Sequence, residues 1–140
     1  MPEDTINIIW FKRDSRLSDH APLQRASVAK EPSLLLYIFE PSVMNNYDSD
    51  IRHWRFVYES LADLNFRLKE YGLEIFICHD EAEIVFEKLC EKFNVKNVFF
   101  YYYMVLNVTY KLFIRLKNLF KSKNIYWIES QICCIHIVFF

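Results

Sequence analysis

The stretch Trp10-Phe11-Lys12-Arg13-Asp14-Ser15-Arg16-Leu17-Ser18-Asp19-His20 follows directly on the apolar run Ile6-Asn7-Ile8-Ile9. An apolar run of this length that ends in charged residues is typical of a buried strand leaving a sheet. The charged side chains then lie at the carboxyl end of the strand, which is where an open α/β sheet holds its ligand crevice. The stretch therefore predicts a first strand and, beside it, a candidate site.

Outward from this stretch, short apolar runs alternate with longer segments of helical periodicity. The apolar runs predict strands over residues 6–11, 34–39, 74–78, 98–102 and 125–128. The segments between them predict helices that start near Ser18 or Asp19, cover 50–71, cover 80–93 and cover 108–122. Strands alternating with helices predict the α/β class, here a Rossmann-like, open, five-stranded, mainly parallel sheet with helices on both faces.

Helix ends and one helical face can also be predicted. Ser18 or Asp19 is a suitable N-cap, Asp80 and Glu83 have capping-box spacing, and Gly72 suits a left-handed C-cap. Apolar residues at intervals of three or four in segment 50–71 predict one buried face. They are Ile51, Trp54, Val57, Tyr58, Leu61, Leu64 and Leu68.

The quoted stretch resembles the opening of the photolyase and cryptochrome family, a Trp-Phe-Arg-Arg-Asp-Leu-Arg-Leu-x-Asp-Asn/His turn, and departs from it mainly at Lys12 and Ser15. The segment His53–Asn65 is also similar to a helix of that family. The resemblance implies an N-terminal α/β domain over residues 1–131. In the family this domain carries a light-harvesting antenna in many members, while a larger helical domain holds the catalytic FAD and the damaged DNA.

The helical FAD-binding domain has no counterpart in these residues. We therefore expect a truncated photolyase/cryptochrome-like N-terminal domain, derived from a light-dependent DNA repair enzyme (deoxyribodipyrimidine photolyase) or a blue-light receptor. It would have no catalysis of its own and would meet DNA only through the missing domain. Two alternatives stay open: a free-standing antenna-chromophore or small-molecule binding module, and an interaction subunit that docks on a separately encoded flavin domain.

The resemblance also implies candidate cofactor-binding residues. Arg13 after the first strand, with Tyr37 and Glu40 at the end of the second, would line the antenna crevice for a deazaflavin, flavin or folate. They would offer a charge, a stacking ring and a hydrogen-bond acceptor. The alternative interpretation is a surface ion pair beside a core tyrosine. No catalytic or metal-binding residue is predicted.

One patch departs from the family pattern. Residues 100–106 replace a polar, glycine-containing loop, and Leu112-Phe113 replace an Arg-Asp pair, so polar positions have become bulky and apolar. Similarity resumes on both sides. We interpret the patch as substitution in a gene released from selection, and a retuned pocket is the rival interpretation.

Several other classes of protein are disfavoured. Gly72 is the sole glycine, so neither a Gly-x-Gly-x-x-Gly turn nor a phosphate-binding P-loop is present. The four cysteines lack metal-site spacing and are predicted to be reduced, structural thiols. A net charge of −1 gives no general attraction to nucleic acid, so any such contact needs a local basic patch or a missing segment.

The two chain ends support two further expectations. The first residues show no secretory signal, which predicts a cytoplasmic protein. Residues 132–140 form an apolar tail in place of the family's interdomain linker. It is too short to span a bilayer and is expected to dock on a surface or to aggregate.

Overall fold

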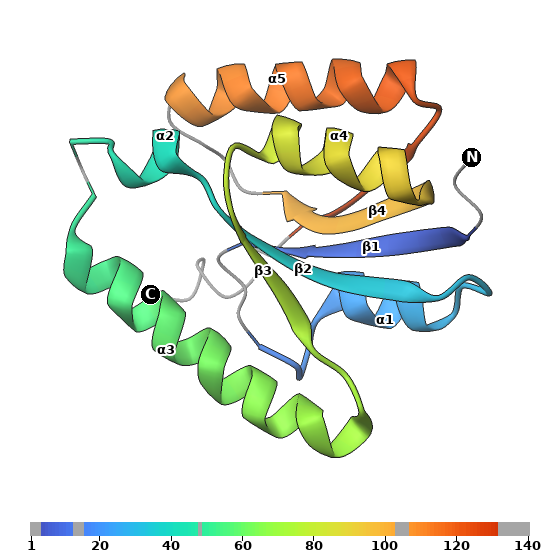
Figure 1. The fold of residues 1–140 in the computed structure, drawn as a ribbon, viewed down its shortest axis with the longest axis horizontal. Coiled ribbons are helices and arrows are strands. Elements are labelled where there is room, and N and C mark those ends of the chain that lie inside the picture. Colours follow the sequence, from blue (N-terminus) through green and yellow to red (C-terminus); the bar gives the residue numbers. More distant parts are fainter. Residues whose placement is uncertain (1–3, 13–15, 48, 103–106, 132–140) are drawn as a thin grey trace, which may run out of the picture.

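Five parallel strands form one sheet in the order β3-β2-β1-β4-β5 in the computed structural model of the chain, which describes residues 4–12, 16–47, 49–102 and 107–131 (Figure 1). The strands are β1 (Thr5–Phe11), β2 (Ser33–Phe39), β3 (Ile75–His79), β4 (Asn94–Tyr102) and β5 (Tyr126–Gln131). The helices are α1 (Ala21–Ser27), α2 (Pro41–Met44), α3 (Ile51–Leu68), the 3-10 turn η1 (Lys69–Tyr71), α4 (Ala82–Lys92) and α5 (Asn107–Ser122). The predicted α/β class and parallel sheet are confirmed.

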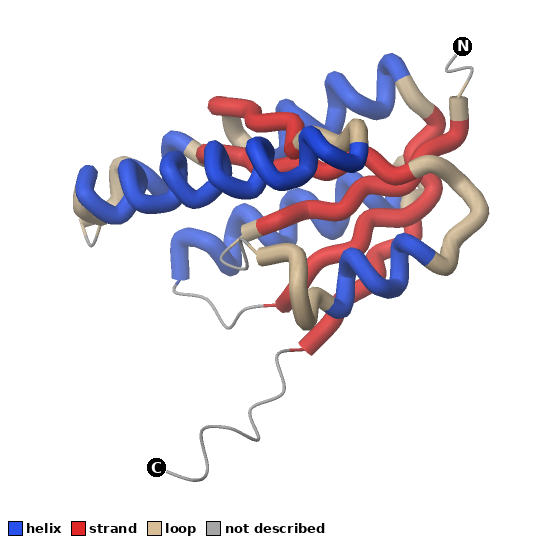
Figure 2. Tube along the Cα trace, turned by 90° about the horizontal axis from the view of Figure 1, so that it is seen from below, coloured by secondary structure: helices blue, strands red, loops and turns tan. Residues whose placement is uncertain are grey.

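Helices cover both faces of the sheet, with α4 and α5 on one side and α1 and α3 on the other (Figures 1 and 2). Successive strand residues point to opposite faces, which divides the core in two. Ile8, Trp10 and Leu36 pack toward α4 and α5. Ile9, Phe11 and Leu35 pack toward α1 and α3. The central strand β1 is thus buried on both sides, as its continuous apolar sequence predicts.

The start of α1 differs from the prediction. Neither Ser18 nor Asp19 caps the helix; the N-cap is the buried His20, whose Nδ1 accepts a hydrogen bond from the backbone N–H of Leu23 at 3.1 Å. Asp19 instead has a left-handed φ of 50°. The His20 ring stacks on Phe11 at 4.8 Å between centroids, so core packing selects this residue as the cap.

Helix α3 has the predicted bounds, but its buried face is narrower than predicted. Leu61, Leu64 and Leu68 are buried, whereas Ile51 and Tyr58 in the first half are 67% and 62% exposed. In this first half only part of the predicted face meets the sheet, where the Trp54 ring packs against Phe39 of β2. Gly72 has a φ of +67°, as predicted for a left-handed C-cap.

Two local predictions after β2 and β3 were wrong or incomplete. The expected capping box at Asp80 is not formed: Glu81 is the N-cap of α4 without a side-chain bond, and Asp80 accepts from the backbone N–H of Glu81. The short helix α2, which begins at Pro41 directly after Glu40, was not predicted. Proline at the first helical position favours such a start.

Three of the sequence-based interpretations concern residues that the structure does not describe. Arg13, most of the altered loop (103–106) and the apolar tail (132–140) lie outside the described residues. Within the described part, no helix combines the length and the apolar character needed to cross a membrane.

Candidate functional site

The carboxyl ends of the strands define the candidate site. The chain runs outward from β1 through β2 to β3 and then returns to place β4 on the other side of β1. The topological switch point therefore lies at the ends of β1 and β4, where open α/β sheets hold their ligands. Tyr37 and Glu40 stand at the end of the adjacent β2, while Arg13 lies outside the described residues.

Lys12 and Glu40 provide charged groups at the carboxyl ends of the strands. The Lys12 ammonium lies 4.1 Å from the Trp10 ring centroid and 4.8 Å from that of Phe100, a cation–π position on the α4/α5 side of the sheet. Burial raises the pKa of Glu40 to about 7; the neighbouring Glu81 also raises it, whereas Lys12 and the Ala82 backbone lower it. Glu40 is therefore a carboxyl group whose charge changes near neutral pH.

Glu81 connects this cluster to α2. Its Oε1 accepts hydrogen bonds from the backbone N–H of Ser42 at 2.9 Å and from the Ser42 hydroxyl at 2.6 Å. Its Oε2 is buried without a hydrogen-bond partner among the described residues. A carboxylate at the first turn of a helix satisfies free backbone N–H groups, so Glu81 holds α2 over the edge of the sheet.

The structure does not bring Tyr37 and Glu40 together. Tyr37 is buried in the core under α1 and α3, with its ring 4.8 Å from that of Phe39. Glu40 interacts with Lys12 and Glu81 instead. Positions three apart in an extended chain point to opposite faces, and this alternation was a signal available in the sequence. The role of Arg13, Tyr37 and Glu40 as one cofactor-binding group stays a prediction.

An apolar cavity of about 350 Å³ lies at the carboxyl ends of the strands, on the face of the sheet that α3 covers. We call it the α2–α3 cavity. It is lined by Phe39, Met44, Ile51, Trp54, Arg55, Tyr58, Glu59 and His79. The Trp54 ring packs edge-on against Phe39 at 6.1 Å between centroids. Its indole Nε1–H is buried and has no hydrogen-bond partner among the described residues. The cavity thus combines aromatic walls with one unsatisfied donor.

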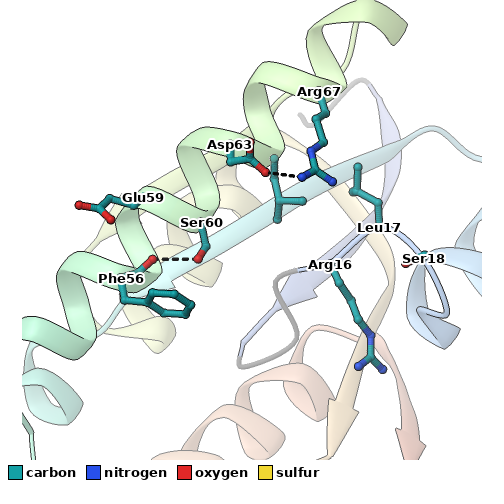
Figure 3. Close-up of a pocket in the computed structure, with 9 residues that line it drawn as sticks. Arg16, Leu17, Ser18, Phe56, Glu59, Ser60, Asp63 and Arg67 are labelled. Carbon is teal, nitrogen blue, oxygen red and sulfur yellow. Dashed lines mark hydrogen bonds and ion pairs between the residues drawn. The ribbon is translucent and has the colours of Figure 1, made fainter.

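A second, larger hollow of about 500 Å³ lies on the other flank of α3, between this helix and the segment after β1 (Figure 3). Arg67 pairs with Asp63 at 2.8 Å, and the Ser60 hydroxyl donates to the carbonyl of Phe56 at 2.8 Å. Arg16 lies across the hollow from α3, with its guanidinium carbon 5.8 Å from the Tyr101 ring centroid. These polar groups already have partners within the protein. The hollow is therefore a poorer candidate for a ligand site than the α2–α3 cavity.

Sequence reasoning missed the residues that make the site distinctive. Trp54 was assigned to the buried helical face, and Lys12 was noted only as a departure from the family pattern. The signal for Lys12 was its position two residues after Trp10, because residues two apart in an extended chain point to the same face of the sheet. No sequence signal shows that the Trp54 indole lacks a partner, because that depends on how α2 and α3 meet the sheet.

The described part of the altered patch belongs to the core. Phe100 is fully buried and packs on Trp127 at 4.3 Å between ring centroids, and Phe113 packs on the same indole at 4.8 Å. The Tyr101 hydroxyl accepts a hydrogen bond from the backbone N–H of Ala21 at 2.8 Å. At these positions the apolar replacements contribute to a packed interior.

Comparison with known proteins agrees with this architecture. The family model for DNA photolyase matches residues 7–111. The chain belongs to this family. Among curated relatives, chicken cryptochrome-2 is 29% identical over 96 residues, and mouse cryptochrome-1 is 26% identical over 86. These matches cover 69% and 61% of the chain but only 16% and 14% of the cryptochromes. The chain thus corresponds to a small part of the length of these relatives.

Solved photolyases and cryptochromes have the same fold. An archaeal photolyase from Sulfolobus tokodaii, solved with two FAD molecules, superposes with a TM-score of 0.78 at 21% identity. The match covers 90% of this chain and 29% of that one. The cryptochrome of Synechocystis superposes with a TM-score of 0.77 at 19% identity, covering 91% and 27%. The chain therefore corresponds to the N-terminal domain of photolyases and cryptochromes, as the sequence predicted.

Proposed function

We propose that this photolyase/cryptochrome N-terminal domain holds a planar aromatic chromophore of the flavin type in the α2–α3 cavity and performs no catalysis of its own. Light-dependent DNA repair or blue-light reception would belong to the longer protein from which the domain derives. The domain's contribution would be to bind and orient a light-absorbing ring.

The observation that carries the proposal is the apolar cavity with aromatic walls, one of which, Trp54, has a buried Nε1–H without a partner among the described residues. A buried donor without a partner costs about 1–3 kcal/mol, which a ligand with a suitable acceptor would recover. Flavin rings have carbonyl oxygens and ring nitrogens on one side and an apolar dimethylbenzene on the other. The volume of about 350 Å³ lies near the lower end of ligand pockets, so it suits a ring system rather than a whole dinucleotide.

The family comparison supports the same class of ligand. The Sulfolobus tokodaii photolyase contains two FAD molecules, and its structure was taken to imply a novel light-harvesting cofactor. The cavity lies at the carboxyl ends of β2 and β3, where Phe39 and His79 line it, on the side of the sheet at which open α/β folds bind their ligands. A deazaflavin or folate antenna is the alternative ligand of the same planar type.

The test is a titration of the purified chain with FMN, followed by quenching of flavin fluorescence. We expect saturable binding that weakens about 2- to 10-fold in Trp54→Phe, because this change keeps the ring but removes the donor. Ile51→Arg puts a charge at the exposed rim of the cavity and should weaken binding further. Phe66→Leu, on an exposed part of α3, is the matched control and should bind as the parent does.

Two outcomes would contradict the proposal. The first is an absence of saturable quenching by the parent protein. The second is equal loss of affinity in Trp54→Phe and Phe66→Leu, which would mean that the cavity is not the site. Arg13→Gln, tested in the same titration, examines the sequence-based prediction that Arg13 contributes to the crevice.

The proposal also includes a cell compartment and a protein partner. We place the protein in the cytoplasm, and the free thiols of Cys78 and Cys90 agree with a reducing compartment. Docking of residues 132–140 on a separately encoded flavin domain stays a prediction, which co-purification of the two chains with and without these residues would test.

A further inference from the structure

The charges of this chain are distributed very unevenly. Residues 92–128 contain seven lysines and arginines and not one aspartate or glutamate. The other residues carry ten cations and all eighteen carboxylates, so the overall charge of −1 hides a basic segment within an acidic chain. Such separation of charge is a physical signal for an anionic partner, because a solvated surface alone gives no reason for it.

Helix α5 concentrates this charge on one surface. Its inner side is anchored in the core by Leu116 and Phe120, which are 2% and 1% exposed. Its outer side carries four exposed cations, two in each of two rows with a spacing of four residues. These are Lys111, Arg115, Lys117 and Lys121, which we call the α5 basic face. Figure 1 shows α5 at the outside of the molecule, on the same face of the sheet as α4, which lies beside it.

Among the residues that the structure describes, the cations of the α5 basic face have no acidic partner in contact. Burial raises the pKa of the Cys90 thiol of α4, Lys123 lowers it and Glu87 raises it, so an acidic side chain of α4 lies near the end of α5. The apolar tail cannot neutralise the face either, because residues 132–140 contain no aspartate or glutamate.

We propose that the α5 basic face binds the phosphate backbone of a nucleic-acid duplex without reading its sequence. Each row places its charges about 6 Å apart on a rigid helix, which suits a regular line of phosphates. A membrane is a poorer partner, because an interfacial helix must bury its apolar side in lipid and that side of α5 is already in the protein core. The exposed Tyr110 and Ile114 between the rows provide only a small apolar surface.

This inference is independent of the chromophore cavity, which lies on the other face of the sheet. It assigns a second surface to the domain and differs from the expectation that DNA is met only through the missing helical domain. It also supplies the local basic patch that the sequence analysis required for any contact with nucleic acid.

The test is fluorescence anisotropy of a short labelled DNA duplex with the full 140-residue chain over a range of salt concentrations. Four phosphate contacts predict a slope of log K against log salt of about −3 to −4. Lys111→Gln/Arg115→Gln removes two contacts and should reduce the slope to about −2. Lys30→Gln/Lys69→Gln removes the same charge from exposed positions elsewhere and should leave the slope unchanged.

Three results would overturn the assignment. One is equal weakening by the two double variants, which would indicate net charge rather than the α5 basic face. Another is binding to poly-L-glutamate as tight as to DNA, which would favour an acidic protein partner. The third is preferential binding to phosphatidylserine vesicles, which would favour a membrane. Circular dichroism melting of each variant verifies that the fold is retained.

Discussion

At the scale of single residues, Glu40 makes the stability of the domain depend on pH. Its pKa is raised from 4.5 to about 7, chiefly by burial, so the folded state holds a proton that the unfolded state releases. The contribution of Glu40 to stability is therefore greatest below pH 4.5, falls as the pH rises toward 7 and is constant above it. The shift corresponds to about 3 kcal/mol at most.

Glu40→Gln removes this dependence, because the amide stays neutral at every pH. We expect the variant to match the parent below pH 4.5 and to be more stable by up to about 3 kcal/mol above pH 7. Urea denaturation at both pH values measures this difference. The exposed Glu70→Gln is the control and should show no such pH dependence. A loss of stability above pH 7 in Glu40→Gln would show that the charged form is favoured in the fold.

His20 is a second residue with a separable role, since it both caps α1 and stacks on Phe11. Loss of an N-cap costs about 0.5–2 kcal/mol, and the lost packing adds to it. His20→Ala should therefore destabilise the domain by about 2–3 kcal/mol in urea denaturation. His20→Asn restores the cap acceptor and should recover part of the loss. Equal destabilisation in both variants would mean that the ring alone matters.

At the scale of elements, the two halves of α3 have different structural roles. The second half anchors the helix to the sheet through fully buried residues such as Leu61. The first half borders the α2–α3 cavity with partly exposed side chains. Leu61→Ala should cost about 2–5 kcal/mol by leaving a void, whereas Phe66→Ala, at a side chain that is 75% exposed, should cost less than about 0.5 kcal/mol. Thermal denaturation of the two variants distinguishes a packed helix from a loosely docked one.

A similar cost for both α3 variants would contradict this division. If Leu61→Ala were as mild as Phe66→Ala, the helix would not depend on its contact with the sheet. The lining of the cavity by α3 would then have no fixed position, and the argument for a preformed chromophore site would fail.

The elements also show what the sequence can predict. Short continuous apolar runs identified all five strands, and apolar residues at intervals of three or four identified the long helices. The short α2 was missed because one helical turn shows no periodicity. Tertiary packing also decided the cap at His20 and the exposure of Ile51 and Tyr58, since both depend on where a helix ends relative to the sheet.

At the scale of the whole molecule, the sheet separates two surfaces with different chemistry. The α3 face carries the aromatic cavity, and the α5 face carries four exposed cations. The family and the fold class followed from the sequence, because the motif after β1 and the alternation of apolar runs with helical segments are local features, whereas the strand order comes from the structure. The grouping of Arg13, Tyr37 and Glu40 as one cofactor-binding set stays a prediction; Tyr37 packs in the core on the α1 and α3 side, and Glu40, directly after β2, interacts with Lys12 and Glu81.

The most direct test of the account is an NMR titration with FMN that follows the indole N–H signals of Trp10, Trp54 and Trp127. Trp54 lines the α2–α3 cavity, whereas Trp10 packs on the other face and the Trp127 indole donates to Glu129. We expect the Trp54 signal to shift with ligand while the other two remain in place. Shifts of Trp10 or Trp127 without a shift of Trp54, or no shift at all, would contradict a chromophore site in this cavity.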